Sequence, residues 1–477
     1  MAAARLTVHS QLAALIRRKP VTTTPETSLR EALQVMAAER VGSIVVVEPE
    51  SGRPLGIFTL HDLLNRVAVK DGDVDRMIMS VMSDSNLLML NWRATVYQAA
   101  LLMARHGVHH ILVVDAADRL AGVVSQGDIY ELQSGGGKAI SGAIRGARDL
   151  DGLTAAADDI RRLGVRMLAE GAAAEPLTQL ISSLNDHLTG RIIELTMQEF
   201  PLPKVPWCWL AFGSEGRFEQ TLSTDQDNGL IFAVAEAEAE AVRQAFLPFA
   251  KAVNGRLDAC GFPLCKGNIM AGNPELCLSV GEWRHKFFSL LQAGNPQALL
   301  NATIFFDFRP LHGQTDLADD LRLWLQENVP GAPIFLRLMA TAALSVEPPL
   351  GVIRDFAFDR SAEFPHTIDL KVSGSRLFVD AARILALANG LAETGTAQRL
   401  RTLAERGKLG RDDIDAIVEG FFFIQQLRLR VQEEGGAAGA ANRVDPDELN
   451  ELDRLIFKEA CKQAKKLQSR LQLEFRL

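Results

Sequence analysis

The chain has 477 residues, of which 47% are hydrophobic and 23% are charged, and its formal net charge is -8 at pH 7. This length predicts roughly three domains, each able to bury its own core. The negative charge argues against broad binding to nucleic acid or to an anionic membrane, and no uncharged apolar run reaches the roughly 18 residues of a membrane span. Five cysteines, an odd number, indicate a reducing compartment, so we expect a cytoplasmic protein.

An internal repeat organises residues 1–135. The segments 43–64 and 110–130 each read as an apolar strand, a turn and a second apolar strand, and an amphipathic segment at helical spacing precedes each. Each copy ends with a hydroxyl residue three positions ahead of an aspartate. These positions are Thr59 and Asp62 in the first copy and Ser125 and Asp128 in the second.

The repeat resembles a tandem pair of CBS domains, modules that pack together and bind adenine nucleotides. The resemblance implies that the Asp accepts hydrogen bonds from a ribose and that the Thr or Ser contacts phosphate. The same spacing also makes a helix capping box without any ligand, and the two uses can coexist. Because CBS modules often pair between chains, the resemblance also implies a homodimer.

Residues 136–200 are expected to connect this sensor to the rest of the chain. The stretch 133–149 is rich in Gly and small residues and predicts a flexible linker. Apolar residues at helical spacing then predict two helices, over 150–171 and 176–200. Such helices could carry a change in the CBS pair to a catalytic site.

The stretch after residue 206 has the spacing that most constrains chemistry. An apolar strand (207–212) is followed by Gly213-Ser214, then by Asp225-Gln226-Asp227, then by a second apolar strand (230–234). In an extended strand, side chains two apart share a face, so two carboxylates would lie side by side and favour a bound cation. Turn chemistry is the alternative, because Asn228-Gly229 suits a tight hairpin.

The sixteen-residue string from Gly213 to Asn228 resembles the nucleotidyltransferase superfamily typified by DNA polymerase β. It is most similar to a bacterial group related to the protein-PII uridylyltransferase and the glutamine-synthetase adenylyltransferase. The resemblance implies two Mg²⁺ (or Mn²⁺) ions on Asp225, Asp227 and a third carboxylate on a neighbouring strand, for which Asp307 is the best match. An ion pair of Asp307 with Arg309 is the alternative.

The same resemblance implies a nucleoside triphosphate on the Gly213-Ser214 turn. Arg217 and Lys266 are further nucleotide-binding candidates, against an ion pair of Arg217 with Glu219 or Asp225 and a solvated surface role for Lys266. Cys260, Cys265 and Cys277 lie nearby, but their spacing fits no common zinc pattern. This part of the chain, 201–320, is the predicted catalytic core.

Residues 321–477 read as helical almost throughout, which predicts a bundle of four to five helices. It resembles the helical substrate-binding domain that accompanies the family's core. The expected fold class is therefore multi-domain α+β: a tandem CBS pair, a mixed-sheet nucleotidyltransferase core and an all-α C-terminal bundle.

The expected function is transfer of a nucleoside monophosphate to a hydroxyl of a protein or small molecule, regulated by adenine nucleotide at the CBS pair. A PII-like acceptor is implied only by the resemblance. The alternative is a nucleotide-sensing regulatory or scaffold protein without turnover. The complete set of Gly-Ser and three acids argues against that alternative.

Overall fold

The computed structural model describes residues 10–16, 19–39, 41–59, 62–63, 74–83, 87–106, 110–125, 137–292, 303–351, 355–358, 363–435 and 440–477. The chain divides into two compact units, Met1–Gly136 and Gly137–Leu477. No helix within the described residues is long and apolar enough to cross a membrane.

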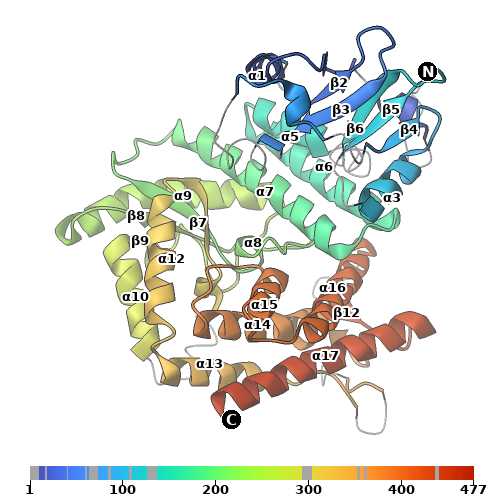
Figure 1. The fold of residues 1–477 in the computed structure, drawn as a ribbon. Coiled ribbons are helices and arrows are strands. Elements are labelled where there is room, and N and C mark those ends of the chain that lie inside the picture. The colour runs from blue at the N-terminus through green and yellow to red at the C-terminus, as the bar shows by residue number, and fades with distance from the viewer. Residues whose placement is uncertain are drawn as a thin grey trace. The chain divides into compact units, whose positions relative to one another are not determined.

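The first unit contains two copies of one motif (Figure 1). The first copy has β1 (Thr22–Thr23), α1 (Leu29–Ala38), β2 (Ser43–Val47) and β3 (Pro54–Thr59); the second has β4 (Met89–Asn91), α3 (Val96–His106), β5 (His110–Val114) and β6 (Leu120–Ser125). In each copy a parallel pair precedes an antiparallel pair, β1-β2-β3 and β4-β5-β6. The antiparallel register shifts at the equivalent place in both, at Val46/Val47 and Val113/Val114. The repeat seen in the sequence is therefore a repeat of structure.

Each copy has its own apolar core. In the first, Ser28 and Glu31 form a reciprocal capping box that fixes where α1 begins. Leu29, Ala32 and Met36 then fall on one face of α1 and are buried.

The second unit begins with a helix where the sequence predicted a flexible linker. Helix α5 (Gly137–Gly146) buries Ile140 and Ile144 against α6 (Leu150–Ala169) and α7 (Ala174–Met197). These two isoleucines are four positions apart and so lie on one helix face, a signal that the Gly-rich composition obscured. The two longer helices, in contrast, were predicted correctly.

A four-stranded mixed sheet forms the centre of this unit. Its order is β10-β7-β8-β9, from β10 (Arg309–Gly313), β7 (Trp207–Ala211), β8 (Asn228–Phe232) and β9 (Cys277–Ser279). Strand β7 pairs antiparallel with both β10 and β8, and β8 pairs parallel with β9. Both faces are covered, so β7 and β8 are buried at almost every position.

Alternation along β7 divides the core in two. Trp209 packs in the cluster with α6, α7 and α9 (Ala239–Ala259), whereas Cys208 and Leu210 pack in the cluster with α10 (Val280–Gln292) and α12 (Asp316–Asn328). Since successive strand residues point to opposite faces, one strand holds both helical layers in place.

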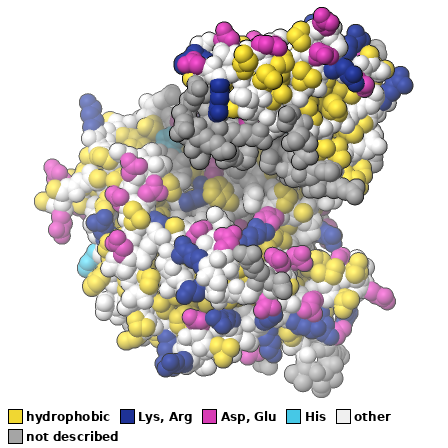
Figure 2. Space-filling view, viewed as in Figure 1, with side chains coloured by type: hydrophobic (Ala, Val, Ile, Leu, Met, Phe, Trp, Pro, Cys, Tyr) yellow, Lys and Arg dark blue, Asp and Glu magenta, His cyan; other side chains and the backbone are white. Residues whose placement is uncertain are grey.

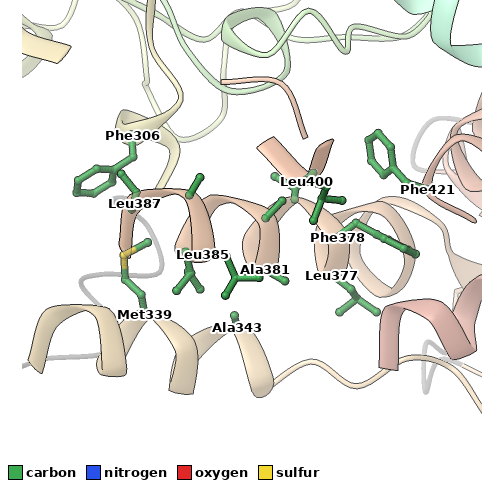
Figure 3. Packing of buried hydrophobic residues seen from close by; sticks show 14 of the residues in the cluster. Phe306, Met339, Ala343, Leu377, Phe378, Ala381, Leu385, Leu387, Leu400 and Phe421 are labelled. Carbon is green, nitrogen blue, oxygen red and sulfur yellow. The ribbon is translucent and has the colours of Figure 1, made fainter. Parts of the chain in front are cut away.

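Five α-helices among the described residues complete the unit: α13 (Pro333–Leu344), α14 (Arg376–Ala388), α15 (Thr396–Glu405), α16 (Arg411–Glu433) and α17 (Glu451–Phe475). A π-helical turn (Lys371–Ser375) leads into α14, and β11 (Ile368–Asp369) pairs with β12 (Arg443–Val444). Leu377, Ala381 and Leu385 on α14 point toward Met339 and Ala343 of α13 (Figure 3). The boundary expected at residue 321 falls inside α12, which packs on the sheet.

The apolar cluster around α14 is continuous with the sheet. It contains Leu210 of β7 and Phe306 as well as Phe421 of α16 and Leu467 of α17. The visible surface of this unit interleaves Lys and Arg with Asp and Glu (Figure 2). The sheet and the helical bundle thus share one hydrophobic core.

Candidate active site

The Gly-Ser turn joins β7 to a single helical turn, α8 (Gly213–Gly216). Phe212 N donates to Asp227 O at 2.8 Å and so continues the β7-β8 ladder to the turn. Gly213 has φ +56°, and a Cβ there would lie 2.8 Å from Oδ2 of Asp227. Both the left-handed backbone and the close approach of the carboxylate require glycine.

Asp225 and Asp227 lie in the extended segment directly before β8. The sequence had placed them in a strand, but the strand begins one residue later, at Asn228. The residue between them explains their direction. Gln226 is buried, and its Nε2 donates to the carbonyl oxygens of Asn254 and Phe262, both at 2.9 Å. Because alternate side chains of an extended chain point to opposite sides, burying Gln226 turns both aspartates the other way.

A thiol, that of Cys265, lies next to the two carboxylates. Ligand atoms of Asp225, Asp227 and Cys265 all lie within 4.8 Å of one another, a spacing that one metal ion can bridge. Burial and then the neighbouring charge of Asp225 raise the pKa of Asp227 to about 7. Desolvated, mutually repelling acids of this kind are what a bound divalent cation would stabilise, so the residues fit such an ion.

This acidic cluster opens on a cavity of about 350 Å³ between the sheet and the helical bundle. One wall is formed by the turn and the segment that precedes β8, and the other by the π-helical turn, α14 and α16. The lining includes Gly213, Ser214, Arg217, Thr224, Asp225, Asp227, Lys371, Arg376, Arg383, Gln425 and Arg428. A cavity of this size can accommodate a small ligand.

Asp307 is placed differently from the expectation. The segment before it is a short 3-10 helix, Thr303–Phe306, rather than a strand, and the aspartate is fully buried. Its carboxylate contacts three arginines: Arg217 Nη1 at 2.7 Å, Arg383 Nη2 at 2.6 Å and Arg399 Nη1 at 2.7 Å. Burial alone would raise the pKa of Asp307, but these charges, Arg383 foremost, hold it well below its ordinary value.

Both oxygens of Asp307 are thereby occupied by guanidinium groups. The ion pair with Arg309 considered from the sequence is not formed; Arg309 instead binds Asp186 at 2.6 Å and stacks on the ring of Phe218. Asp307 therefore joins the core to α14 and α15.

Of the other site residues predicted from the sequence, Arg217 and Ser214 line the cavity and Lys266 does not. Arg217 lines the cavity and pairs with Glu219 at 2.7 Å as well as with Asp307, so the ion pair considered as the alternative to nucleotide binding is present. Ser214 also lines the cavity, and its Oγ lies 3.5 Å from Thr224 Oγ1. Lys266 is exposed and lies outside the cavity lining.

In the first unit, the first hydroxyl-carboxylate pair forms a cap. Thr59 N and Oγ1 donate to Asp62 Oδ2 at 3.0 and 2.7 Å, and Asp62 N donates back to Thr59 Oγ1 at 3.2 Å. Ser83 Oγ donates to the other oxygen of Asp62 at 3.1 Å. Ser125 ends β6, and Asp128 lies outside the described residues.

Three further site residues were missed from the sequence. Cys265 joins the two aspartates, and Gln425 and Arg428 reach the cavity from a helix about 200 positions away. Zinc-type spacing was the wrong test for Cys265, because its partners are carboxylates from another segment. Gln425 and Arg428 could have been found from the sequence, because they are polar residues on an otherwise apolar face of α16.

Comparison with known families agrees with this architecture. CBS domain models match residues 12–69 and 81–135, a model described as "Putative nucleotidyltransferase DUF294" matches 158–297, and one described as "Putative nucleotidyltransferase substrate binding domain" matches 333–475. The chain belongs to the DUF294 family. It is a multi-domain α+β member that carries a CBS pair, as the two motifs predicted.

Individual relatives of this DUF294 protein align with about a quarter of it. An uncharacterized protein of Methanopyrus kandleri is 27% identical over 24% of the chain and 59% of its own length. Inosine-5'-monophosphate dehydrogenase of Aquifex aeolicus is 27% identical over 24% of the chain and 22% of its own length. A CBS domain-containing protein of Bacillus subtilis is 32% identical over 23% of the chain and 74% of its own length. The chain thus spans less than two thirds of the first two relatives.

Among solved structures, a CBS domain protein of Pyrobaculum aerophilum complexed with AMP is 28% identical and covers 25% of this chain and 88% of its own, with a TM-score of 0.24. A CBS-domain protein of Agrobacterium tumefaciens is also 28% identical, covering 25% of this chain and 96% of its own, with a TM-score of 0.23.

Proposed function

We propose that this protein transfers a nucleotidyl group from a nucleoside triphosphate to a hydroxyl of a protein or small-molecule acceptor. The observation that carries the proposal is the pair Asp225 and Asp227, held side by side at the wall of the cavity and next to the Gly213-Ser214 turn. The family match to a nucleotidyltransferase domain and its substrate-binding domain supports the same reaction class.

Asp225 and Asp227 would hold a divalent cation, Mg²⁺ or Mn²⁺, which supplies charge neutralisation for the phosphates during transfer. Ser214 and the backbone of the turn would hold the triphosphate. Lys371, which forms no ion pair with a described residue and lies within electrostatic reach of Asp227, adds positive charge on the opposite wall. Asp307 is left out of this metal set because arginines already occupy its carboxylate.

In the transfer step, the acceptor oxygen forms a bond to the α-phosphorus while the bond from that phosphorus to the bridging oxygen breaks. Pyrophosphate leaves with the bonding electron pair. The hydroxyl proton passes to water, because Asp225 and Asp227 would hold the cation during transfer. Asp307 is unsuited to accepting it since its pKa is strongly lowered.

The test is release of pyrophosphate from nucleoside triphosphates, screened with Mg²⁺ and Mn²⁺ and with candidate acceptors that include a PII-type protein. Asp225→Asn combined with Asp227→Asn should abolish release while the far-UV circular dichroism stays as in the parent and the unfolding midpoint does not fall. Asp413→Asn, an exposed acid on α16, serves as the matched control. Equal release by the double variant and the parent would refute the assignment.

The CBS pair gives the regulatory half of the proposal: an adenine nucleotide bound there changes the transferase activity. Exposed apolar residues in the same unit, including Met77, Met79, Tyr97 and Leu101, support a homodimer through this region. Calorimetric titration with AMP and ATP, followed by activity at saturating nucleotide, tests the regulation. An unchanged rate and an unchanged substrate affinity would exclude it.

A further inference from the structure

Two buried polar residues on α16 face the cavity from the helical domain. Gln425 is 2% exposed and Arg428 is 7% exposed, and both line the cavity. They are three positions apart, so they lie on one face of the helix. Their neighbours Ile424, Leu427 and Leu429 are buried apolar residues. Polar groups at such depth are costly unless something binds them.

Other residues of the protein satisfy only part of the hydrogen-bonding capacity of Gln425 and Arg428. Arg428 Nη1 donates to Gln425 Oε1 at 2.6 Å, and Arg428 Nε donates to Asn442 Oδ1 at 3.0 Å. Because a guanidinium can only donate, Gln425 must turn its oxygen toward Arg428 and its amide nitrogen away. Among the described residues, neither Nε2 of Gln425 nor Nη2 of Arg428 has a hydrogen-bond acceptor, so two donors remain at the cavity wall.

Arg428 also lacks a direct ion pair among the described residues, unlike the other arginines of the cavity, and Asp369 and Glu219 attract it only at longer range. Arg217 pairs with Glu219 and Asp307, and Arg376 and Arg383 pair with Asp380. Both protein partners of Arg428 are neutral amides, and within the described residues it forms no ion pair. A buried guanidinium without an anion in direct contact leaves a place for one.

We propose that Gln425 and Arg428 form a subsite for an oxyanion, a phosphate or carboxylate group of a substrate. The amide and the guanidinium would donate to it together, and Arg428 would supply the charge. As a part of the transferase, the subsite rests on the proposed function: its anion is either a phosphate of the nucleotide or an acidic group of the acceptor. Binding of an anion at this place does not depend on that function.

The experiment is calorimetric titration of the full chain with inorganic triphosphate in EDTA, so that no divalent ion contributes. Arg428→Met should weaken binding by roughly tenfold or more, because it removes charged hydrogen bonds, and Gln425→Leu should weaken it several-fold. Arg428→Lys keeps the charge but loses the planar guanidinium, so its affinity should lie between those of the parent and Arg428→Met. Arg430→Met changes an exposed arginine of the same helix, paired with Asp453, and should leave binding unchanged. Any binding at the CBS unit would be common to all variants.

Retention of parent affinity by Arg428→Met, with its fold intact by circular dichroism, would overturn the subsite. If Arg428→Met does not fold, Arg428→Lys and Gln425→Leu decide in the same way. Asp225→Asn with Asp227→Asn removes two carboxylates that repel an anion from the cavity, so metal-free triphosphate binding should persist or strengthen even if the transferase proposal fails, which separates the two. A parallel titration with Mg²⁺ and nucleotide identifies the source of the anion. Weakening by Arg428→Met there assigns it to the nucleotide, and unchanged affinity assigns it to the acceptor.

Discussion

Arg383 of α14 donates to both oxygens of Asp307, from Nε at 3.0 Å and from Nη2 at 2.6 Å. The arginine belongs to the helical domain and the aspartate precedes strand β10 of the sheet. This bidentate pair is buried and is one of the polar contacts that hold the two walls of the cavity relative to each other. Arg399 and Arg217 complete the neutralisation from α15 and from the Gly-Ser turn.

Asp307→Asn should destabilise the protein strongly without any metal present. Removing the charge leaves three buried guanidinium groups facing a neutral amide, and breaking a buried ion pair costs about 3 to 5 kcal/mol. Urea unfolding in EDTA measures the loss, with exposed Asp413→Asn as the control expected to stay within about 0.5 kcal/mol. A normal midpoint for Asp307→Asn, with metal affinity lost instead, would restore the metal role expected from the sequence.

Asp227→Asn should have the opposite effect on the metal-free protein. The pKa of Asp227 is raised to about 7 when folded, above the ordinary value of 3.8. The folded state therefore binds more protons than the unfolded state between these values, and stability falls as the pH rises from about 4 to 7. Above pH 7 the neutral amide should stabilise by a few kcal/mol, and at pH 4 the variant and parent should differ little. Urea unfolding at pH 4 and pH 8 in EDTA is the measurement.

Metal affinity should rise with pH through the same range. A proton on Asp227 competes with a cation for the carboxylate, so Mn²⁺ binding should weaken by roughly tenfold for each unit below about pH 7 and level off above it. Calorimetry with Mn²⁺ at pH 6, 7 and 8 follows the change. An affinity independent of pH would mean that Asp227 is not a ligand.

Gly216→Ala should prevent normal packing of the turn. A Cβ there would lie 1.9 Å from the backbone oxygen of Asp307, an overlap that only a backbone shift could relieve. Gly255, inside α9, has open space at the same position, so Gly255→Ala should stabilise by about 0.5 to 1 kcal/mol. Thermal unfolding of the two variants compares them directly. Equal midpoints would show that the turn lies further from Asp307.

Cys265→Ser should alter which ions the acidic cluster prefers. A thiolate favours softer ions such as Zn²⁺ or Co²⁺, whereas Mg²⁺ is bound through oxygen. We expect the variant to lose about tenfold or more in Zn²⁺ affinity and little in Mg²⁺ affinity. Competition titrations with the two ions on parent and variant test this. An equal loss for both ions would instead mean that the side chain positions the aspartates.

The features predicted well from the sequence are those set by local spacing. Strand β7, the glycine turn and the paired acids follow one another within about 25 residues, and each obeys a periodicity or a backbone requirement. The two CBS copies were found in the same way, since a repeat doubles every local signal. Helices α6 and α7 were found from their apolar faces.

What was missed depends on contacts between distant segments. The spacing around Asp307 does not show that Arg383 and Arg399, 76 and 92 positions later, neutralise it, and an acid in an apolar stretch looks the same in either role. The buried donors of α16 are a similar case. Helix α5 was missed for a different reason, because its glycines outweighed the spacing of Ile140 and Ile144.

The hydrophobic core that runs from Leu210 to Leu467 has a consequence for how the chain can be divided. A shortened protein that ended near residue 330 would expose the face of the sheet that carries Cys208 and Leu210, and it would leave Asp307 without Arg383 and Arg399. A protein that began near residue 330 would leave Arg383 and Arg399 without Asp307. The sheet and the bundle should therefore melt in a single transition, and neither half should survive proteolysis alone.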